Sequence, residues 1–299
     1  MANITPKRNG EFLKIVFAIL AEKPEGMPAK AILAELGKRI ELTDFERGSY
    51  PSDPSHRPRF EKIVRFATIP TVKAGWLYKD KGIWTVTDEG RKANETIVDP
   101  EKLYRTAYDI YKKWASSQET LSEEDGGELE EPSASTALIA LEEAQEQAWQ
   151  QVRDFLLEMD PYDFQNLVGD LLTAMGYHVD WIAPPGPDKG IDIVAFNDPL
   201  GAKKPRIIVQ VKHKTSQSVS SKDLREFLSV IGADRVGIFV SSSGFTRDAE
   251  EAARGQENKL VTLINLSKFF DLWVKNFENL SPEAQKRLPL MPVYYLALD

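Results

Sequence analysis

The sequence predicts two domains of different fold class: an amino-terminal helical domain that ends in a β-hairpin, and a carboxy-terminal α/β domain. Three observations predict this. Apolar residues recur at helical spacing in residues 10–73, strands and helices alternate in residues 161–264, and an acidic stretch with few apolar residues lies between them. We therefore expect domains at 1–98 and 149–299, joined by a helix and a flexible acidic linker at 99–148.

The amino-terminal domain is predicted as three helices followed by a hairpin, which is the order of a winged helix. The helices are expected at 10–22, 28–40 and 59–73. Pro70 is expected to end or kink the third helix. The segment WLYKDKGIWTVT then alternates about a Lys81-Gly82 turn, as the two strands of a hairpin do.

The carboxy-terminal domain alternates strands with helices, which predicts a sheet covered on both faces. A helix at 100–116 and the flexible stretch 116–135 precede it, and order resumes with a helix at 137–158. Further helices are expected at 161–175, 221–230 and 246–256, and strands at 177–182, 191–196, 207–212, 235–240 and 260–264.

Composition excludes several classes of protein. The chain of 299 residues has no cysteine, which excludes disulfides and thiolate metal sites. It has neither a membrane-length apolar run nor the apolar core of a secretory signal, so we expect a cytoplasmic protein. The net charge of −8 divides into +4 for residues 1–98, −9 for 99–148 and −3 for 149–299. A basic amino-terminal domain is therefore compatible with a nucleic-acid partner.

One predicted hairpin brings polar residues together. Two β-rich runs flank residues 197–205, which are rich in Pro, Gly and Lys. If the runs pair about Gly201, position 192 lies opposite position 210. Because strand side chains alternate, Asp192, Gln210 and Lys212 share one face, which we expect to be exposed to solvent. The apolar neighbours turn into the core: Ile191, Ile193, Val209 and Val211.

Asp192, Gln210 and Lys212 suit the hydrolysis of a phosphodiester bond. The Asp192 carboxylate, the Gln210 amide oxygen and the Val211 carbonyl are donors of the kind that Mg²⁺ or Mn²⁺ prefers. The Lys212 ammonium suits activation of a water or the negative charge that develops at the phosphate. Judged from these residues alone, an ordinary surface Asp–Lys pair is the commoner alternative.

Four motifs resemble, in order, those of the Mrr family in the PD-(D/E)xK nuclease superfamily. YDFQNLVGDLLTAMGY resembles the family's helix before the first strand, and PDKGIDIV resembles its GDxGID turn. IVQVKH resembles its QxK strand, and VSSSGFTRDAEEAA resembles its TSGFT element. The resemblance spans residues 161–266. The segment KAGWLYKDKGIWTVTDEGRKA is also similar to the family's winged-helix domain.

The resemblance implies a PD-(D/E)xK nuclease-like fold, a mixed sheet flanked by helices, and metal-dependent cleavage of double-stranded DNA. It implies metal binding by Asp192 and Gln210 and catalysis by Lys212. Gln165 stands where many relatives carry a glutamate that assists the metal, and Asp188 is the remaining nearby anion. We expect a type IV restriction enzyme directed at foreign or methylated DNA. A repair or junction nuclease, and a DNA-binding regulator without activity, are open alternatives, as is a homodimer on DNA.

Other residues are candidates for DNA contacts. His213 adjoins the site, and Ser243 lies in an SSSG stretch that either binds phosphate or leads into a plain helix cap. Basic residues crowd the third helix and the wing, the parts of a winged helix that contact DNA. They are Arg57, Arg59, Lys62, Arg65, Lys73, Lys79 and Lys81. The alternative is that these are solubilising surface charges.

Overall fold

The computed structural model describes residues 4–50, 56–118, 133–186, 190–213, 217–232, 234–255 and 260–293. The chain divides into two compact units, one within residues 1–149 and one within residues 150–294. Asp188 and the acidic residues 119–132, the centre of the expected flexible stretch, lie outside the described residues. Within the described ranges, no helix is long and apolar enough to cross a membrane.

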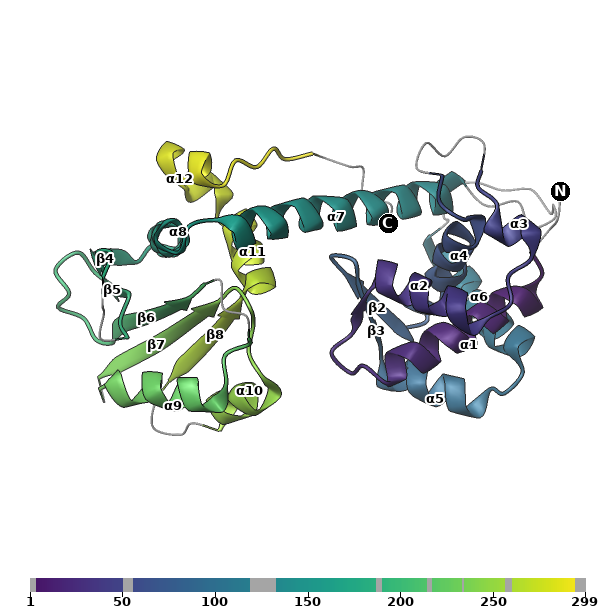
Figure 1. The fold of residues 1–299 in the computed structure, drawn as a ribbon, viewed down its shortest axis with the longest axis horizontal. Helices are drawn as coiled ribbons and strands as arrows, with labels where there is room; N and C mark the ends of the chain where they lie inside the picture. The colour runs from purple at the N-terminus through teal and green to yellow at the C-terminus, as the bar shows by residue number, and fades with distance from the viewer. Residues whose placement is uncertain are drawn as a thin grey trace. The chain divides into compact units, whose positions relative to one another are not determined.

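The amino-terminal unit is a winged helix with additional helices (Figure 1). Its sheet has the order β1-β3-β2. The three predicted helices and the hairpin are present, and α3 and α5 are additional. The elements are α1 (Pro6–Ala21), β1 (Met27–Pro28), α2 (Ala29–Arg39), α3 (Asp44–Arg47), α4 (Arg59–Lys73), β2 (Leu77–Asp80), β3 (Ile83–Val86), α5 (Asp88–Thr96) and α6 (Pro100–Gln118).

Local sequence explains how these elements begin and turn. The Thr5 side chain caps α1 by accepting the N–H of Arg8. The hairpin turns at Lys81 and Gly82, both with positive φ (47° and 76°), as a two-residue turn between twisted strands requires. Pro70 does not end α4, which continues to Lys73, and a kink at Pro70 stays a prediction.

Helix α6 belongs to the core of the amino-terminal unit. It confirms the helix predicted at 100–116, and it packs against α1 and α4. Leu103 and Ala107 are fully buried in the same cluster as Phe12 and Val16 of α1. The approach is close, because a Cβ placed on Gly10 would lie 1.8 Å from the carbonyl oxygen of Pro100.

The second unit holds a mixed sheet of five strands in the order β4-β5-β6-β7-β8. Strands β4, β5 and β6 run antiparallel, and β6, β7 and β8 run parallel. The long helix α7 (Ser133–Glu158) crosses the boundary between the units. The other elements are α8 (Pro161–Ala174), β4 (His178–Ile182), β5 (Ile193–Phe196), β6 (Arg206–Lys212), α9 (Ser221–Val230), β7 (Arg235–Ser241), α10 (Arg247–Arg254), β8 (Val261–Asn265), α11 (Leu266–Lys275), the 3-10 helix η1 (Phe277–Asn279) and α12 (Pro282–Arg287).

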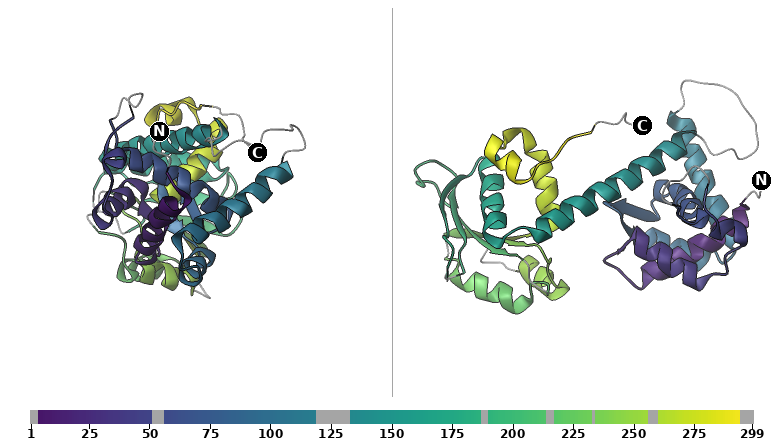
Figure 2. Two further views of the ribbon diagram at one scale, coloured as in Figure 1. Left: turned by 90° about the vertical axis from the view of Figure 1, so that its right-hand side faces the viewer. Right: turned by 45° about the horizontal axis from the view of Figure 1, so that its top comes forward.

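Helices cover both faces of this sheet, as Figures 1 and 2 show: α9 and α10 lie on one face, and α8 and α11 on the other. On the first face, Phe227 of α9 packs with Ile208 and Phe239. On the second, the rings of Phe164 and Phe269 lie 5.4 Å apart. The predicted mixed α/β fold is therefore confirmed.

Candidate active site

The hairpin β5–β6 has the predicted register. Ile193 pairs with Val209, and Ala195 pairs with Ile207, so each pair is centred on position 201. Asp192 lies one residue before β5, and its N–H donates to the carbonyl of Val209 (2.8 Å). Asp192 therefore lies beside the end of β6, where the predicted register places it.

The expected solvent exposure of Asp192 is wrong. Only 6% of the residue is exposed, and its Oδ2 accepts the N–H of Val211 (2.7 Å). The alternation of polar and apolar residues misled the prediction because this sheet carries helices on both faces, so neither face is open. Ile191 likewise packs against the cluster that contains Ile208 and Phe227, and buried Ile193 does not belong to that cluster.

Gln210 supplies a second oxygen at this place. Gln210 lies one residue before Val211, whose N–H donates to the carboxylate of Asp192. Its Oε1 is buried and has no hydrogen-bond partner among the residues that the structure describes. A buried amide oxygen without a donor is costly, and a bound cation would satisfy it.

Lys212 is held by Asp223, an acid that was not predicted from the sequence. Its Nζ lies 2.6 Å from Oδ1 of Asp223 in α9. The other oxygen of Asp223 accepts the N–H and the hydroxyl of Ser220, in a capping box. The Lys212 ammonium, followed by the bonds from Ser220, holds the pKa of Asp223 well below its usual range. Asp223 therefore stays charged at neutral pH.

A sequence signal for Asp223 existed. Ser220 and Asp223 stand three residues apart, directly before the apolar positions of α9. This spacing marks a helix start with a capping box. It fixes the carboxylate on the first turn of the helix, although the contact with Lys212 follows only from the packing of α9 on the sheet.

Gln165 and His213 have contacts with the main chain. Buried Gln165 donates through Nε2 to the carbonyl of Ala183 (2.8 Å), and the N–H of Ala183 donates to the carbonyl of Asp192 (2.8 Å). His213 stacks on Phe164, with ring centroids 4.4 Å apart, and its Nε2 contacts the Met159 carbonyl (3.0 Å). Gln165 thus supports the segment that carries Asp192, and a contact between His213 and phosphate stays a prediction.

Ser243 is tied to its own loop. Its hydroxyl donates to the carbonyl of Gln217 (3.0 Å), and its carbonyl accepts the hydroxyl of Ser218 (3.0 Å). Thr246 caps α10 by accepting the N–H of Ala249. The plain-cap alternative therefore accounts for Thr246, and phosphate binding by Ser243 stays a prediction.

The donor set fits one hard divalent cation with few protein ligands. The described residues contain no group of three or more His, Cys, Asp and Glu placed to hold a metal. Asp192 nevertheless offers a carboxylate beside β6, and Gln210 offers its oxygen Oε1, which has no partner within the described ranges. Oxygen donors, with water completing the shell, are what Mg²⁺ uses in such sites.

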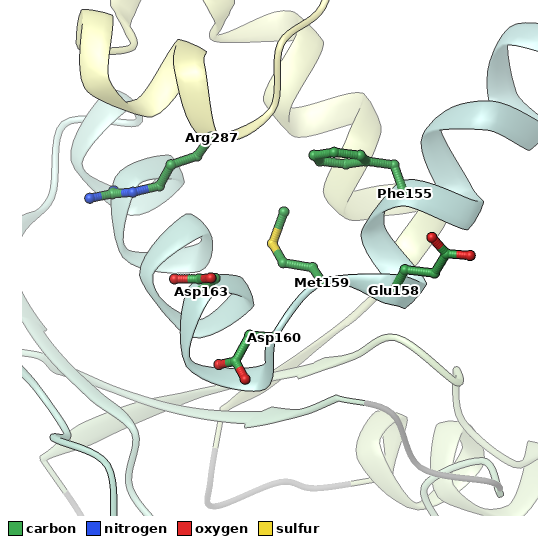
Figure 3. Close-up of a pocket in the computed structure, with 6 residues that line it drawn as sticks. All are labelled: Phe155, Glu158, Met159, Asp160, Asp163 and Arg287. Atoms are coloured by element: carbon green, nitrogen blue, oxygen red, sulfur yellow. The ribbon is translucent and has the colours of Figure 1, made fainter.

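A separate cavity of about 310 Å³ lies among α7, α8 and α12 (Figure 3). Phe155, Met159 and Arg287 line it together with three carboxylates, Glu158, Asp160 and Asp163. Arg287 pairs with Asp170. The acidic lining repels phosphate, and none of the candidate catalytic residues contributes to it.

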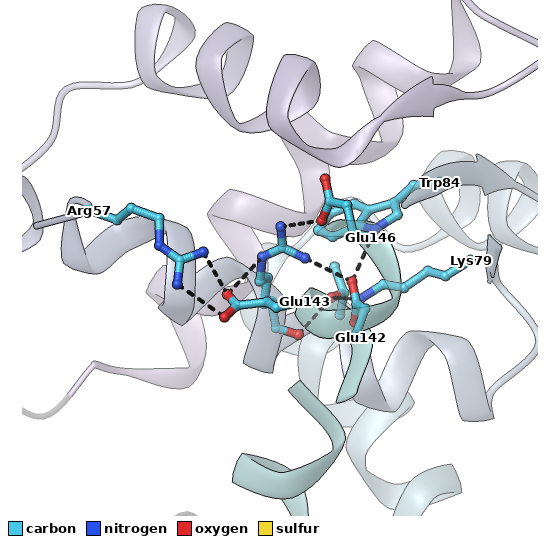
Figure 4. A network of polar contacts seen from close by, with 8 residues as sticks. Arg57, Lys79, Trp84, Glu142, Glu143 and Glu146 are labelled. Atoms are coloured by element: carbon cyan, nitrogen blue, oxygen red, sulfur yellow. Dashed lines mark hydrogen bonds and ion pairs between the residues drawn. The ribbon is translucent and has the colours of Figure 1, made fainter. Parts of the chain in front are cut away.

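The basic residues predicted to bind DNA are mostly covered. Of the seven, Lys73 alone is exposed, and only 4% of Arg65 is exposed. Arg57, Arg65 and Lys79 form ion pairs with glutamates of α7 (Figure 4). The others have aromatic neighbours: Arg59 and Lys62 beside Tyr50, Lys73 over Trp114, and Lys81 near Trp149.

The chain is similar to known restriction enzymes. Residues 156–273 match the Mrr catalytic restriction endonuclease family, and residues 10–96 match the Mrr N-terminal domain. Over 304 residues it is 24% identical to the type IV methyl-directed restriction enzyme EcoKMrr of Escherichia coli strain K12. That alignment covers 92% of this chain and 94% of EcoKMrr.

Two solved structures show a looser likeness. One is the MspJI restriction endonuclease in complex with a 27-mer oligonucleotide, with a TM-score of 0.38, 16% identity, and coverage of 57% of this chain and 40% of that one. The other is the DNA modification-dependent restriction endonuclease AspBHI, also with a TM-score of 0.38 and 16% identity, covering 71% and 58%.

Proposed function

This chain belongs to the Mrr-like restriction endonucleases, and on that premise we propose that it hydrolyses phosphodiester bonds of double-stranded DNA with the help of Mg²⁺ or Mn²⁺. The observation that carries the proposal is the pair of oxygen donors at the end of β6. The carboxylate of Asp192 is fixed by the N–H of Val211, and the buried side-chain oxygen of the preceding residue, Gln210, has no donor among the described residues.

Each residue of the site has a separate role in this proposal. Asp192, Gln210 and the Val211 carbonyl would hold the cation, which supplies an activated water and charge neutralisation when bound. Lys212 presents an ammonium to the negative charge that develops at the phosphate. Asp223 orients that ammonium through its 2.6 Å contact. Gln165 supports Asp192 indirectly, because it donates to the carbonyl of Ala183, whose N–H donates to the carbonyl of Asp192.

We infer that the targets are foreign or methylated DNA. The support is the likeness to EcoKMrr, a methyl-directed enzyme that aligns over nearly the whole chain. The winged-helix unit is a second DNA-binding element in this proposal. Two copies on one duplex would be needed to cut both strands, which makes a homodimer on DNA part of the proposal.

A plasmid panel tests this function. Methylated, unmethylated and branched plasmids are incubated with Mg²⁺, Mn²⁺ or a chelator, and nicking and linearisation are measured. We expect cleavage of the methylated plasmid alone, and only with metal. A preference for branched DNA would support a repair nuclease instead, and metal-independent binding without cleavage would support a regulator. Asp192→Asn is the matched inactive control.

A further inference from the structure

The surface of α4 and the wing is already occupied by acidic side chains of this chain. We call Glu142, Glu143 and Glu146 of α7 the glutamate triplet, and Arg57, Arg65, Lys79 and Trp84 the basic face. All of these residues belong to the amino-terminal unit. Figure 4 shows the triplet of α7 among the cations of the basic face.

Each cation of the basic face is matched by a carboxylate. Arg65 contacts all three glutamates, at 3.0 Å to Glu142, 3.4 Å to Glu143 and 2.7 Å to Glu146. Arg57 makes a bidentate ion pair with Glu143, in which Nη1 and Nη2 each lie 3.0 Å from a carboxylate oxygen. Glu142 also accepts from Lys79 (2.8 Å) and from the ring N–H of Trp84 (3.2 Å). Three cations thus meet three anions.

The same place in a winged helix is where DNA is read. The third helix, here α4, enters the major groove, and the wing contacts the backbone. Arg65 projects from α4, and Lys79 and Trp84 belong to the wing strands β2 and β3. Carboxylates on a helix and phosphates on a duplex are therefore alternative anions for one set of cations.

We propose that the glutamate triplet is an internal competitor for DNA: α7 covers the basic face in the free protein, and DNA binds there only when α7 leaves. This inference rests on the proposed function for its ligand. The contact is suited to exchange, since the cost of desolvating buried ion pairs offsets most of their attraction. Burial indeed lowers the pKa of Lys79, against the opposing effect of Glu142.

Neutralising the triplet is the first test. Binding of a methylated duplex is measured in chelator, so that no cleavage occurs, for the full chain and for Glu142→Gln/Glu143→Gln/Glu146→Gln. If α7 masks the face, affinity rises about tenfold or more, because the masked fraction no longer competes. The control Glu25→Gln/Glu41→Gln/Glu95→Gln removes the same charge from exposed positions of the same unit and changes affinity by less than about twofold.

A designed disulfide is the second test, and it does not depend on the stability of the triplet variant. A Cβ on Gly82 would lie 3.1 Å from Cβ of Glu146, close to the separation of about 3.5–4.5 Å in disulfides. The chain has no other cysteine. Oxidised Gly82→Cys/Glu146→Cys should bind DNA about tenfold or more weakly than the same protein after reduction. Gly82→Cys alone, which shares the strained turn, should not respond to reduction.

The outcomes separate this inference from the proposed function. Equal affinities of wild type and the triplet variant, or a cross-linked protein that binds DNA as the reduced one does, would overturn the competitor role and leave DNA binding intact. A cysteine pair that does not oxidise would overturn the contact itself. If no form of the protein binds any duplex at low salt, the proposed DNA-binding function fails instead.

Discussion

Aspartate and asparagine have almost the same shape, so replacing Asp192 by asparagine tests the effect of the negative charge alone. Asp192→Asn keeps an oxygen that can accept the N–H of Val211 but removes the negative charge that would attract a cation. We expect the turnover rate on methylated plasmid to fall about 100- to 1000-fold or more, with the DNA affinity unchanged in chelator. Cleavage at the wild-type rate would show that the metal is bound elsewhere.

Asp192→Ala should behave differently from Asp192→Asn in stability. Alanine leaves the N–H of Val211 buried without its acceptor, which costs about 1–3 kcal/mol. Chemical denaturation of both variants measures the difference. Equal free energies of unfolding would mean that the bond to Val211 contributes little to folding.

Asp223 offers a prediction about the orientation of Lys212. Asp223→Asn retains an oxygen for the cap with Ser220 and loses the charge that holds the ammonium at 2.6 Å. The turnover rate should fall about tenfold, with little change in the Michaelis constant for DNA, because Lys212 acts mainly in the transition state.

The control for Asp223 is Ser220→Ala, which weakens the cap and keeps the ion pair. It should lower stability by about 1 kcal/mol and leave the turnover rate within about twofold of wild type. If Ser220→Ala slows turnover as much as Asp223→Asn does, Asp223 acts through the helix cap and not through Lys212. A double variant of Asp223 and Lys212 no slower than Lys212→Ala would support the shared role.

For single residues, the sequence predicted which residues pair across the sheet better than it predicted which residues are buried and which side chains contact them. The register about Gly201 followed from the turn residues and from the apolar alternation, both of which are local. The burial of Asp192 and the partner of Lys212 depend on α9, which covers that face from a distant part of the chain. Alternation alone does not reveal whether a face is covered.

At the scale of elements, the packing of α1 on α6 is sensitive to a single added atom. A Cβ on Gly10 would lie 1.8 Å from the carbonyl oxygen of Pro100, which is backbone and cannot rotate away. Gly10→Ala should therefore destabilise the amino-terminal unit by about 3 kcal/mol or more, the upper part of the range for overpacking. Thermal unfolding followed by circular dichroism measures this.

Gly37 is the matched control, a second glycine inside a helix of the same unit. A Cβ there would have its nearest neighbour, a ring atom of Phe60, at 3.4 Å, which is ordinary contact. Gly37→Ala should be neutral or stabilising by about 0.5–1 kcal/mol, because alanine favours the helix. A Gly10→Ala protein as stable as Gly37→Ala would contradict the close approach of α1 and α6.

Elements with a strong local pattern could be predicted, and short ones could not. The range of α4 agrees with its prediction at both ends, whereas β1 has two residues and exists only because it pairs with β3. Helix α11 was overlooked although signals were present. Asn265 caps it, and Leu266, Phe269 and Trp273 recur at helical spacing on its buried face.

At the scale of the whole molecule, charge sums proved a poor guide to the exposed surface. Residues 1–98 carry +4, which predicted a basic domain. Residues 99–148 carry −9, and their glutamates at 142, 143 and 146 pair with Arg57, Arg65 and Lys79 in the same compact unit. Residues 1–148 together therefore carry −5. Which charges neutralise each other is a property of the fold and cannot be counted along the chain.

Two compact units make metal binding measurable without any substrate. If Asp192 and Gln210 hold a divalent cation, adding Mg²⁺ stabilises only the unit of residues 150–294. A concentration ten times the dissociation constant adds about 1.4 kcal/mol, which raises the melting temperature of a unit of this size by about 3–6 °C. Calorimetry should show this shift in one transition and not in the other. Asp192→Asn should abolish it, and a shift that survives this exchange, or moves both transitions, would refute the assignment of the metal to Asp192.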